Sequence, residues 1–164
     1  MDSALLASER HDWQTPELVL ELVRKLGPIL LDPCTTDDNP CGAVARYVTQ
    51  GLDLGWSCWA DTGQSGLVFV NPPYGRQLGA WVEKATSEAV YGVEIVLLTP
   101  GRPDTRWYDH ARSTCNAYCE IRGRLTFKGA PHPAPFPSAL HYWGPKPWLF
   151  AHVFSVLGRV GVRS

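Results

Sequence analysis

Two short apolar runs with a helical segment between them constrain the fold of this chain most strongly. The runs span residues 67–70 and 95–98, contain only Leu, Val, Phe and Ile, and are flanked by glycine and proline. Such runs are typical of strands that are buried on both faces. Between them, apolar residues recur at the spacing of one helix face: Leu78, Trp81, Val82, Ala85 and Ala89. Strand, helix and strand in succession predict an α/β fold with a parallel sheet.

Further elements are expected on either side of this unit. Thr15-Pro16-Glu17 predicts the start of an amphipathic helix, with Thr15 as N-cap, and Gly27-Pro28 ends that helix. Residues 29–31 predict a buried strand that ends at Asp32. The other expected elements are a helical stretch over residues 43–48, a loop over 51–66, a short helix begun by Pro103-Asp104, strands over 117–121, 125–127 and 138–143, and a helix or strand over 150–157.

The length and composition indicate one globular domain over residues 1–164, with residues 1–11 loose. Hydrophobic residues make up 45% of the chain and charged residues 19%, which excludes a wholly disordered protein. No apolar run approaches the length of a membrane span, and the N-terminus does not resemble a signal peptide. Five cysteines without a Cys-x-x-Cys pair favour a cytoplasmic location, and the spacing of Cys115, Cys119 and His110 does not favour a zinc site.

Charge is distributed unevenly along the chain although the formal net charge is only −1. Residues 1–61 carry ten acidic and four basic side chains, whereas the remainder carries eleven basic and six acidic ones. A basic group in the second part could contact phosphates: Arg102, Arg106, Arg112, Arg122, Arg124 and Lys128. The alternative is that these side chains are scattered and merely solvated.

The apolar run 67–70 stops at the tetrapeptide Asn71-Pro72-Pro73-Tyr74. In open α/β sheets, ligands bind beyond the carboxyl ends of the strands, where this tetrapeptide is expected. The Asn71 side-chain oxygen and the Pro72 carbonyl are two acceptors, and the prolines stiffen the loop without adding N–H donors. The Tyr74 ring offers a flat face for stacking a planar heterocycle.

Two converging acceptors suit a substrate amino group, which has two hydrogens to donate. The exocyclic amine of a nucleobase is a poor nucleophile because its lone pair is delocalised into the ring. Accepting both hydrogens favours a tetrahedral nitrogen with a localised lone pair, which can attack an electrophilic methyl group without a strong general base. The tetrapeptide therefore predicts amino-group methylation.

The tetrapeptide resembles the catalytic motif of S-adenosylmethionine-dependent amino methyltransferases. Further segments, in order, resemble the small DNA N-6-adenine methyltransferases of bacteriophages and prophages: "DWQTP" at 12–16, "LDPCTTDDNPCGAVARYVT" at 31–49, "GLDLGW" at 51–56, "WVEKA" at 81–85, "LLTPGRPDTRWY" at 97–108 and "GRLTFKG" at 123–129. The resemblance implies a Rossmann-like methyltransferase fold, with a mostly parallel sheet, an antiparallel last strand and helices on both faces. It also implies double-stranded DNA as partner, a flipped-out base, and protection of DNA from restriction.

The resemblance assigns roles to individual residues. Asn71, Pro72, Pro73 and Tyr74 would be catalytic, and Phe127 would stack on the base from the side opposite Tyr74. Arg102 and Arg124, from the basic group, are expected to bind the substrate DNA. S-adenosylmethionine would be held by Asp12, Trp13, Thr15, Pro16, Asp32, Pro33, Cys34 and Asp53, and either Asp37 or Asp38 could supply a second acid beside Asp53.

Two features depart from larger methyltransferases. Residues 32–37 replace the usual glycine-rich turn, so a different loop shape is expected around the cofactor. A separate target-recognition domain is missing, so sequence specificity must be low or come from "GAPHPAPFP" (129–137), the arginines or a second subunit. Alternative acceptors are cytosine N4, an RNA base and a protein glutamine, and the chain could also be an inactive nucleic-acid-binding relative.

Overall fold

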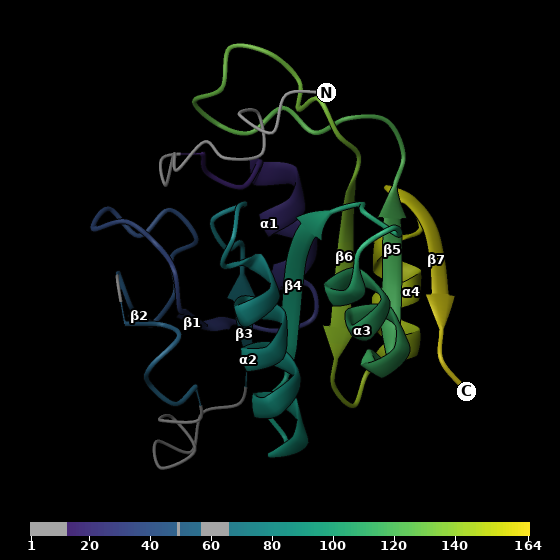
Figure 1. Ribbon diagram of the computed structural model, residues 1–164, viewed down its shortest axis with the longest axis horizontal. Coiled ribbons are helices and arrows are strands. Elements are labelled where there is room, and N and C mark those ends of the chain that lie inside the picture. The colour runs from purple at the N-terminus through teal and green to yellow at the C-terminus, as the bar shows by residue number, and fades with distance from the viewer. Residues whose placement is uncertain (1–12, 49, 57–65) are drawn as a thin grey trace.

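Seven strands form a single mixed sheet in the computed structural model, which describes residues 13–48, 50–56 and 66–164 (Figure 1). The strands are β1 (Ile29–Asp32), β2 (Ala45–Arg46), β3 (Leu67–Val70), β4 (Ile95–Pro100), β5 (Ala117–Ile121), β6 (Ser138–Trp143) and β7 (Gly158–Val162). The helices are α1 (Glu17–Arg24), α2 (Leu78–Val90), α3 (Arg106–Thr114) and α4 (Pro147–Phe154). The α/β class predicted from the apolar runs is therefore confirmed.

The strand order is β2-β1-β3-β4-β6-β5-β7. The first four of these strands pair in parallel, whereas β6 is antiparallel to both of its neighbours, β4 and β5. Because β4 and β5 are both antiparallel to β6, they run in the same direction as each other. The carboxyl ends of β1, β3, β4 and β5 consequently meet at one edge of the sheet, where ligands bind in open α/β sheets.

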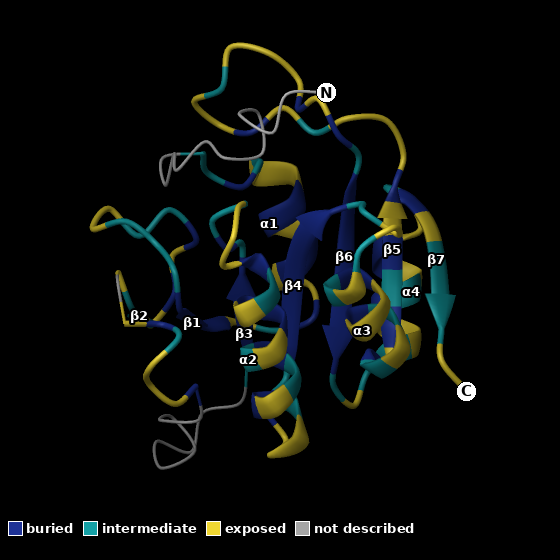
Figure 2. Ribbon diagram, viewed as in Figure 1, coloured by how far each residue is buried: buried dark blue, intermediate teal, exposed yellow. Residues whose placement is uncertain are grey.

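Helices cover both faces of the sheet, as expected. Leu67 and Phe69 of β3 pack in one apolar cluster with α1 and α4, whereas Val68 and Val70 pack in a second cluster with α2 and α3. Figure 1 shows α2 and α3 on the near side of the sheet, and Figure 2 shows buried strands between helices whose outer sides are exposed. A strand covered on both faces must be apolar at every position, which explains the uninterrupted run.

The first helix begins differently from the prediction. The N-cap position is Pro16, and no side chain caps this end of the helix. Thr15 was predicted as the N-cap, but its hydroxyl lies 3.1 Å from the side-chain amide nitrogen of Asn71. A partner distant in sequence therefore replaces the local capping bond that the sequence signal suggested.

Three other element predictions were wrong or incomplete. Residues 43–48 do not form a helix, because 45–46 form β2 and pair with β1. Residues 125–127 form no strand, although adjacent Lys128 makes an isolated antiparallel bridge with Gln14. Strand β7, which follows α4, was not predicted. It pairs antiparallel with β5, as β6 does on the other side of β5. The expected loose residues 1–11 and most of the expected loop 51–66 lie outside the described residues.

Candidate functional site

A cavity of about 450 Å³ opens at the carboxyl edge of the sheet, in the size range of small-molecule sites. Its lining combines the Asn-Pro-Pro-Tyr tetrapeptide and the start of α2 with segments from four other parts of the chain. The lining residues are Trp13, Pro33, Cys34, Thr35, Thr36, Val48, Leu52, Asp53, Asn71, Pro72, Pro73, Tyr74, Gln77, Trp81, Phe127 and Phe136. The structure thus brings together nine of the residues expected in the site: Trp13, Pro33, Cys34, Asp53, Asn71, Pro72, Pro73, Tyr74 and Phe127.

Asn71 directly follows β3 and is held by both its side chain and its backbone. Its Nδ2 donates to the Thr15 hydroxyl at 3.1 Å, and its carbonyl oxygen accepts from the Cys34 thiol at 3.3 Å. With Nδ2 engaged by Thr15, Oδ1 is the end of the amide that can accept a hydrogen bond from a ligand. The residues that follow, Pro72 and Pro73, have no N–H groups to compete with such a ligand.

Tyr74 belongs to an aromatic cluster, which we define as Trp13, Tyr74, Phe127 and Phe136. The Trp13 and Phe127 rings are stacked at 6.1 Å and 15°. Tyr74 meets Phe127 edge-on at 6.1 Å and 80°, and Phe136 at 5.6 Å and 67°. Edge-to-face packing leaves no gap between two rings. Phe127 was expected to stack on the substrate opposite Tyr74, but its ring is only 2% exposed and touches Tyr74 directly.

The Tyr74 hydroxyl is buried and has no hydrogen-bond partner among the described residues. Burial, with a smaller contribution from neighbouring Cys34, raises the pKa of Tyr74 well above its ordinary value. The phenol is therefore neutral at physiological pH and cannot serve as a base there. What Tyr74 offers the cavity is its ring.

The loop after β1 carries four lining residues, residues 33–36. Asp32, which precedes them, is buried and outside the lining; its carboxylate accepts from the Cys34 backbone N–H at 3.2 Å. Burial raises the pKa of Asp32, although hydrogen bonds from Cys41, Cys34 and Thr35 partly oppose that shift. Asp32 therefore holds this loop from the side away from the cavity. The polar side chains of the loop are engaged within the protein: the Cys34 thiol donates to the Asn71 carbonyl, the Thr36 hydroxyl donates to Asp38, and the Thr35 hydroxyl is buried.

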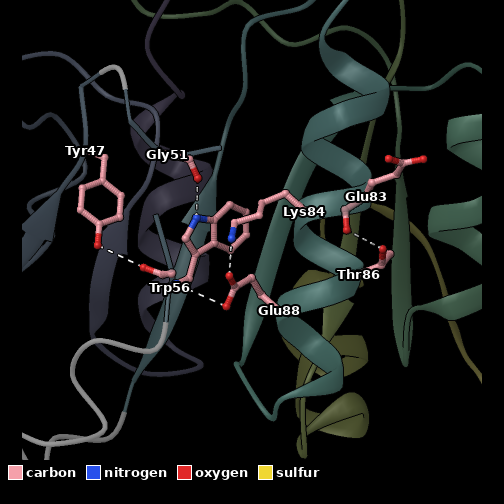
Figure 3. A network of polar contacts seen from close by, with 8 residues as sticks. Tyr47, Gly51, Trp56, Glu83, Lys84, Thr86 and Glu88 are labelled. Atoms are coloured by element: carbon pink, nitrogen blue, oxygen red, sulfur yellow. Dashed lines mark hydrogen bonds and ion pairs between the residues drawn. The ribbon is translucent and has the colours of Figure 1, made fainter. Parts of the chain in front are cut away.

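Loop 50–56 contributes Leu52 and Asp53 to the cavity and is anchored to α2 through Trp56 (Figure 3). The Trp56 indole N–H donates to the Gly51 carbonyl at 2.8 Å, and its backbone N–H donates to Glu88 at 3.3 Å. Glu88 is itself paired with Lys84. Trp56 is completely buried, so this loop is held by both apolar packing and hydrogen bonds.

Arg102 and Arg124, which were expected to bind the substrate, do not line the cavity. Arg102 comes after β4 and forms an ion pair with Asp104 at 2.9 Å, and Arg124 is exposed in the loop after β5. Arg112 was grouped with them by sequence, but its guanidinium lies over the Tyr118 ring at 3.1 Å. The basic residues therefore do not all lie together: Arg102 and Arg124 follow the carboxyl ends of β4 and β5, whereas Arg112 lies in the last turn of α3.

The remaining expected cofactor residues occupy other positions. Thr15 and Pro16 do not line the cavity, and Asp12 lies outside the described residues. Asp37 and Asp38 are exposed and outside the lining as well, and Asp38 accepts from the Thr36 hydroxyl and from the Gln14 side chain.

Sequence reasoning missed seven lining residues: Thr35, Thr36, Val48, Leu52, Gln77, Trp81 and Phe136. Thr35 and Thr36 directly follow Cys34, so the expected loop could have been extended to include them. Trp81 was assigned to the core, and it does pack there at 5% exposure while its edge reaches the cavity. Phe136 gives no local signal, because it is one apolar residue in a proline-rich loop.

One comparison with known proteins identifies a family that covers most of the chain. A family model described as DNA N-6-adenine-methyltransferase (Dam) matches residues 2–136. No curated protein matches the chain. Within the described ranges, none of the helices is both long and apolar enough to span a bilayer, and no group of three or more metal-ligating side chains occurs.

Proposed function

Because the chain belongs to the DNA N-6-adenine-methyltransferase family, we propose that it methylates the N6 amine of adenine in DNA, with S-adenosylmethionine as donor. The observation that carries this proposal is the position of Asn71, which directly follows β3 and lines the cavity with its amide nitrogen hydrogen-bonded to Thr15. This leaves Oδ1 as one acceptor, and we propose the carbonyl of the next residue, Pro72, as the second. An amine donating to both oxygens would lie against the Tyr74 ring.

The cavity fits the cofactor that the family implies. Its apolar surfaces, such as Leu52 and Trp81, suit an adenine ring, and the Asp53 carboxylate suits ribose hydroxyls. When bound, S-adenosylmethionine supplies an electrophilic methyl group.

We assign the sheet, with β6 inserted antiparallel between β4 and β5, to the Rossmann-like methyltransferase class.

The chain's own contribution to catalysis is to hold the amine. Hydrogen bonds to Asn71 Oδ1 and the Pro72 carbonyl favour a tetrahedral nitrogen whose lone pair is available. Tyr74 and Cys34 stay protonated, because burial raises the pKa of both groups. The rate enhancement is therefore assigned to hydrogen bonding and positioning, and the excess proton is released to water after the transfer.

The distribution of charged residues around the carboxyl edge of the sheet supports DNA binding next to β4 and β5. Exposed Asp37, Asp38 and Asp53 flank the β1 and β2 end of the cavity. Basic residues follow the carboxyl ends of the other strands: Arg76 after β3, Arg102 after β4, and Arg122, Arg124 and Lys128 after β5. A polyanion is attracted to the second group and repelled by the first. Adenine N6 inside a duplex is not accessible to a methyl donor, so we propose that the target base is flipped out.

Methyl transfer from tritiated S-adenosylmethionine tests this function. Purified protein is incubated with duplex DNA, single-stranded DNA, RNA and a glutamine-containing protein acceptor, and each product is digested and analysed by mass spectrometry. We expect N6-methyladenine in duplex DNA, and loss of label with N71A although calorimetry still detects cofactor binding. Label on cytosine, RNA or protein alone would replace adenine as the acceptor, and absence of both binding and transfer would refute the proposal.

A further inference from the structure

We propose that one loop, residues 122–137 between β5 and β6, is the element that grips the DNA, and that it binds the phosphates beside the target base. We call this segment the basic loop. The inference rests on the proposed function in taking the bound polyanion to be DNA. The sequence allowed three sources of DNA recognition, namely this loop, the arginines and a second subunit, and the proposal selects the first.

The charge of the basic loop is entirely positive. It contains Arg122, Arg124 and Lys128, all of them exposed, and the chain has no acidic residue after Glu120. Within the described residues, neither Arg122 nor Arg124 forms an ion pair, whereas Arg102 in the neighbouring loop is paired with an aspartate. A guanidinium without a carboxylate partner can bind a phosphate without first breaking an ion pair.

The basic loop lies beside the cavity that would hold the target base. It extends beyond the carboxyl edge of the sheet, and most of its residues are exposed (Figures 1 and 2). Two of its residues, Phe127 and Phe136, are buried in the aromatic cluster and line the cavity. Arg124 precedes Phe127 by three residues, so its backbone lies within about 11 Å of the cavity wall. A DNA strand whose base enters the cavity must therefore pass close to these cations.

The backbone of the basic loop is held in shape without DNA. The Ala134 N–H donates to the Leu125 carbonyl at 2.8 Å across the loop, and the Gly101 N–H donates to the Pro137 carbonyl at 2.7 Å. Prolines at positions 131, 133, 135 and 137 restrict the remaining backbone. Little conformational entropy is then lost on binding, so a small number of charges can give measurable affinity.

The basic loop has few groups that could read a base sequence. Between its two aromatic anchors, residues 129–133 are Gly-Ala-Pro-His-Pro, and His132 is the one side chain among them that can hydrogen-bond to a base edge. Contacts to phosphates position a protein on DNA without carrying sequence information. Binding through this loop should therefore depend strongly on salt and little on sequence.

The double variant R122Q/R124Q tests the phosphate contacts. Binding of a fluorescein-labelled duplex is followed by anisotropy at several salt concentrations. Each phosphate contact adds about 0.9 to the slope of log Kd against log salt, so the variant should lower the slope by about 1.8 and weaken binding at physiological salt about ten- to thirtyfold. R122K/R124K keeps both charges and should keep the slope.

Arg163 provides the matched control. It is also exposed, but it lies at the opposite edge of the sheet, where its backbone N–H donates to the carbonyl of Asn116 just before β5. R163Q should leave the affinity and the slope unchanged. An unchanged slope in R122Q/R124Q, or an equal change in R163Q, would overturn the proposal. If the double variant does not fold, R124Q alone should lower the slope by about 0.9, and an unchanged slope in R124Q is equally decisive.

Cofactor binding and methylation separate this inference from the proposed function. Calorimetry should give the same cofactor affinity in the variants as in the wild type, because neither Arg122 nor Arg124 lines the cavity. If R122Q/R124Q loses DNA affinity but the wild type methylates no acceptor, the proposed function fails and the role of the loop stands. If the wild type methylates DNA and the variant binds DNA equally well, the role of the loop fails and the function stands.

Competition with unlabelled nucleic acids tests the remaining parts of the proposal. Duplexes of different sequence should compete within about threefold of one another, as expected for phosphate contacts. A strong preference for one sequence that H132A abolishes would show that the loop reads bases, and would overturn the assignment to phosphates. Tighter binding of single-stranded RNA than of duplex DNA would overturn the choice of partner.

Discussion

The stability of the protein should decrease at mildly acidic pH because of one histidine in the core. His141 lies in β6, is completely buried, and has its Nε2 3.1 Å from the Thr99 hydroxyl. Its other ring nitrogen, Nδ1, has no partner within the described part of the chain. Burial, with a smaller effect of the positive charge of Arg112, lowers the pKa of His141 to about 3 from the ordinary value of 6.5.

The direction of the effect follows from which state binds more protons. Below pH 6.5 the unfolded chain protonates this histidine, whereas the folded protein keeps it neutral until the pH approaches 3. The stabilisation is therefore fully present above pH 6.5 and is lost as the pH falls. With these two pKa values, the free energy of unfolding should decrease by about 2 kcal/mol between pH 7.5 and pH 5.

Urea unfolding followed by tryptophan fluorescence, at several pH values, measures this loss. The comparison is between the wild type and H141Q, because glutamine can keep a hydrogen bond to Thr99 but does not titrate. The exposed His152 provides the matched control, H152Q. Because other groups titrate in both proteins, the effect of His141 is the difference between the wild type and H141Q in how the free energy of unfolding changes with pH. Equal pH dependence in the wild type and H141Q would refute the argument, as would an effect of H152Q equal to that of H141Q.

Three further substitutions test the packing around the site. G51A places a methyl group 1.7 Å from the Pro33 carbonyl oxygen and should cost about 1–3 kcal/mol in urea unfolding, whereas G55A, with open space at that position, should cost little. Y74F removes a buried hydroxyl without a partner among the described residues, so stability should be unchanged or about 1 kcal/mol higher and methylation should persist; loss of methylation would show that the hydroxyl acts in catalysis. F69A should cost about 3–5 kcal/mol because Phe69 is fully buried, and a melting temperature close to that of the wild type would contradict the packing described.

The features that could be predicted from the sequence are those with strong local signals. The apolar runs predicted β3 and β4 because strands buried on both faces must be apolar throughout. The tetrapeptide was placed correctly beyond β3 because proline cannot continue the hydrogen bonding of a central strand. Both inferences require only neighbouring residues.

The features that could not be predicted depend on partners distant in sequence. Thr15 followed by Pro16 fits a helix N-cap equally well whether or not Asn71 offers its amide 56 residues later. The two-residue strand β2 forms because β1 provides a parallel edge, and nothing in its own sequence requires a strand. Phe136 enters the aromatic cluster only through the course of the loop between β5 and β6, which carries no periodic pattern.

The position of β6 has a consequence for how the chain folds during synthesis. β6 lies between β4 and β5, yet both of those strands are synthesised before it, and the family match itself ends at residue 136, just before β6 begins. Until residues 138–143 leave the ribosome, β4 and β5 each present an unpaired edge on which other chains can aggregate. The sheet is therefore expected to fold only after β6 has left the ribosome, and fragments that end before Ser138 should bind chaperones or aggregate.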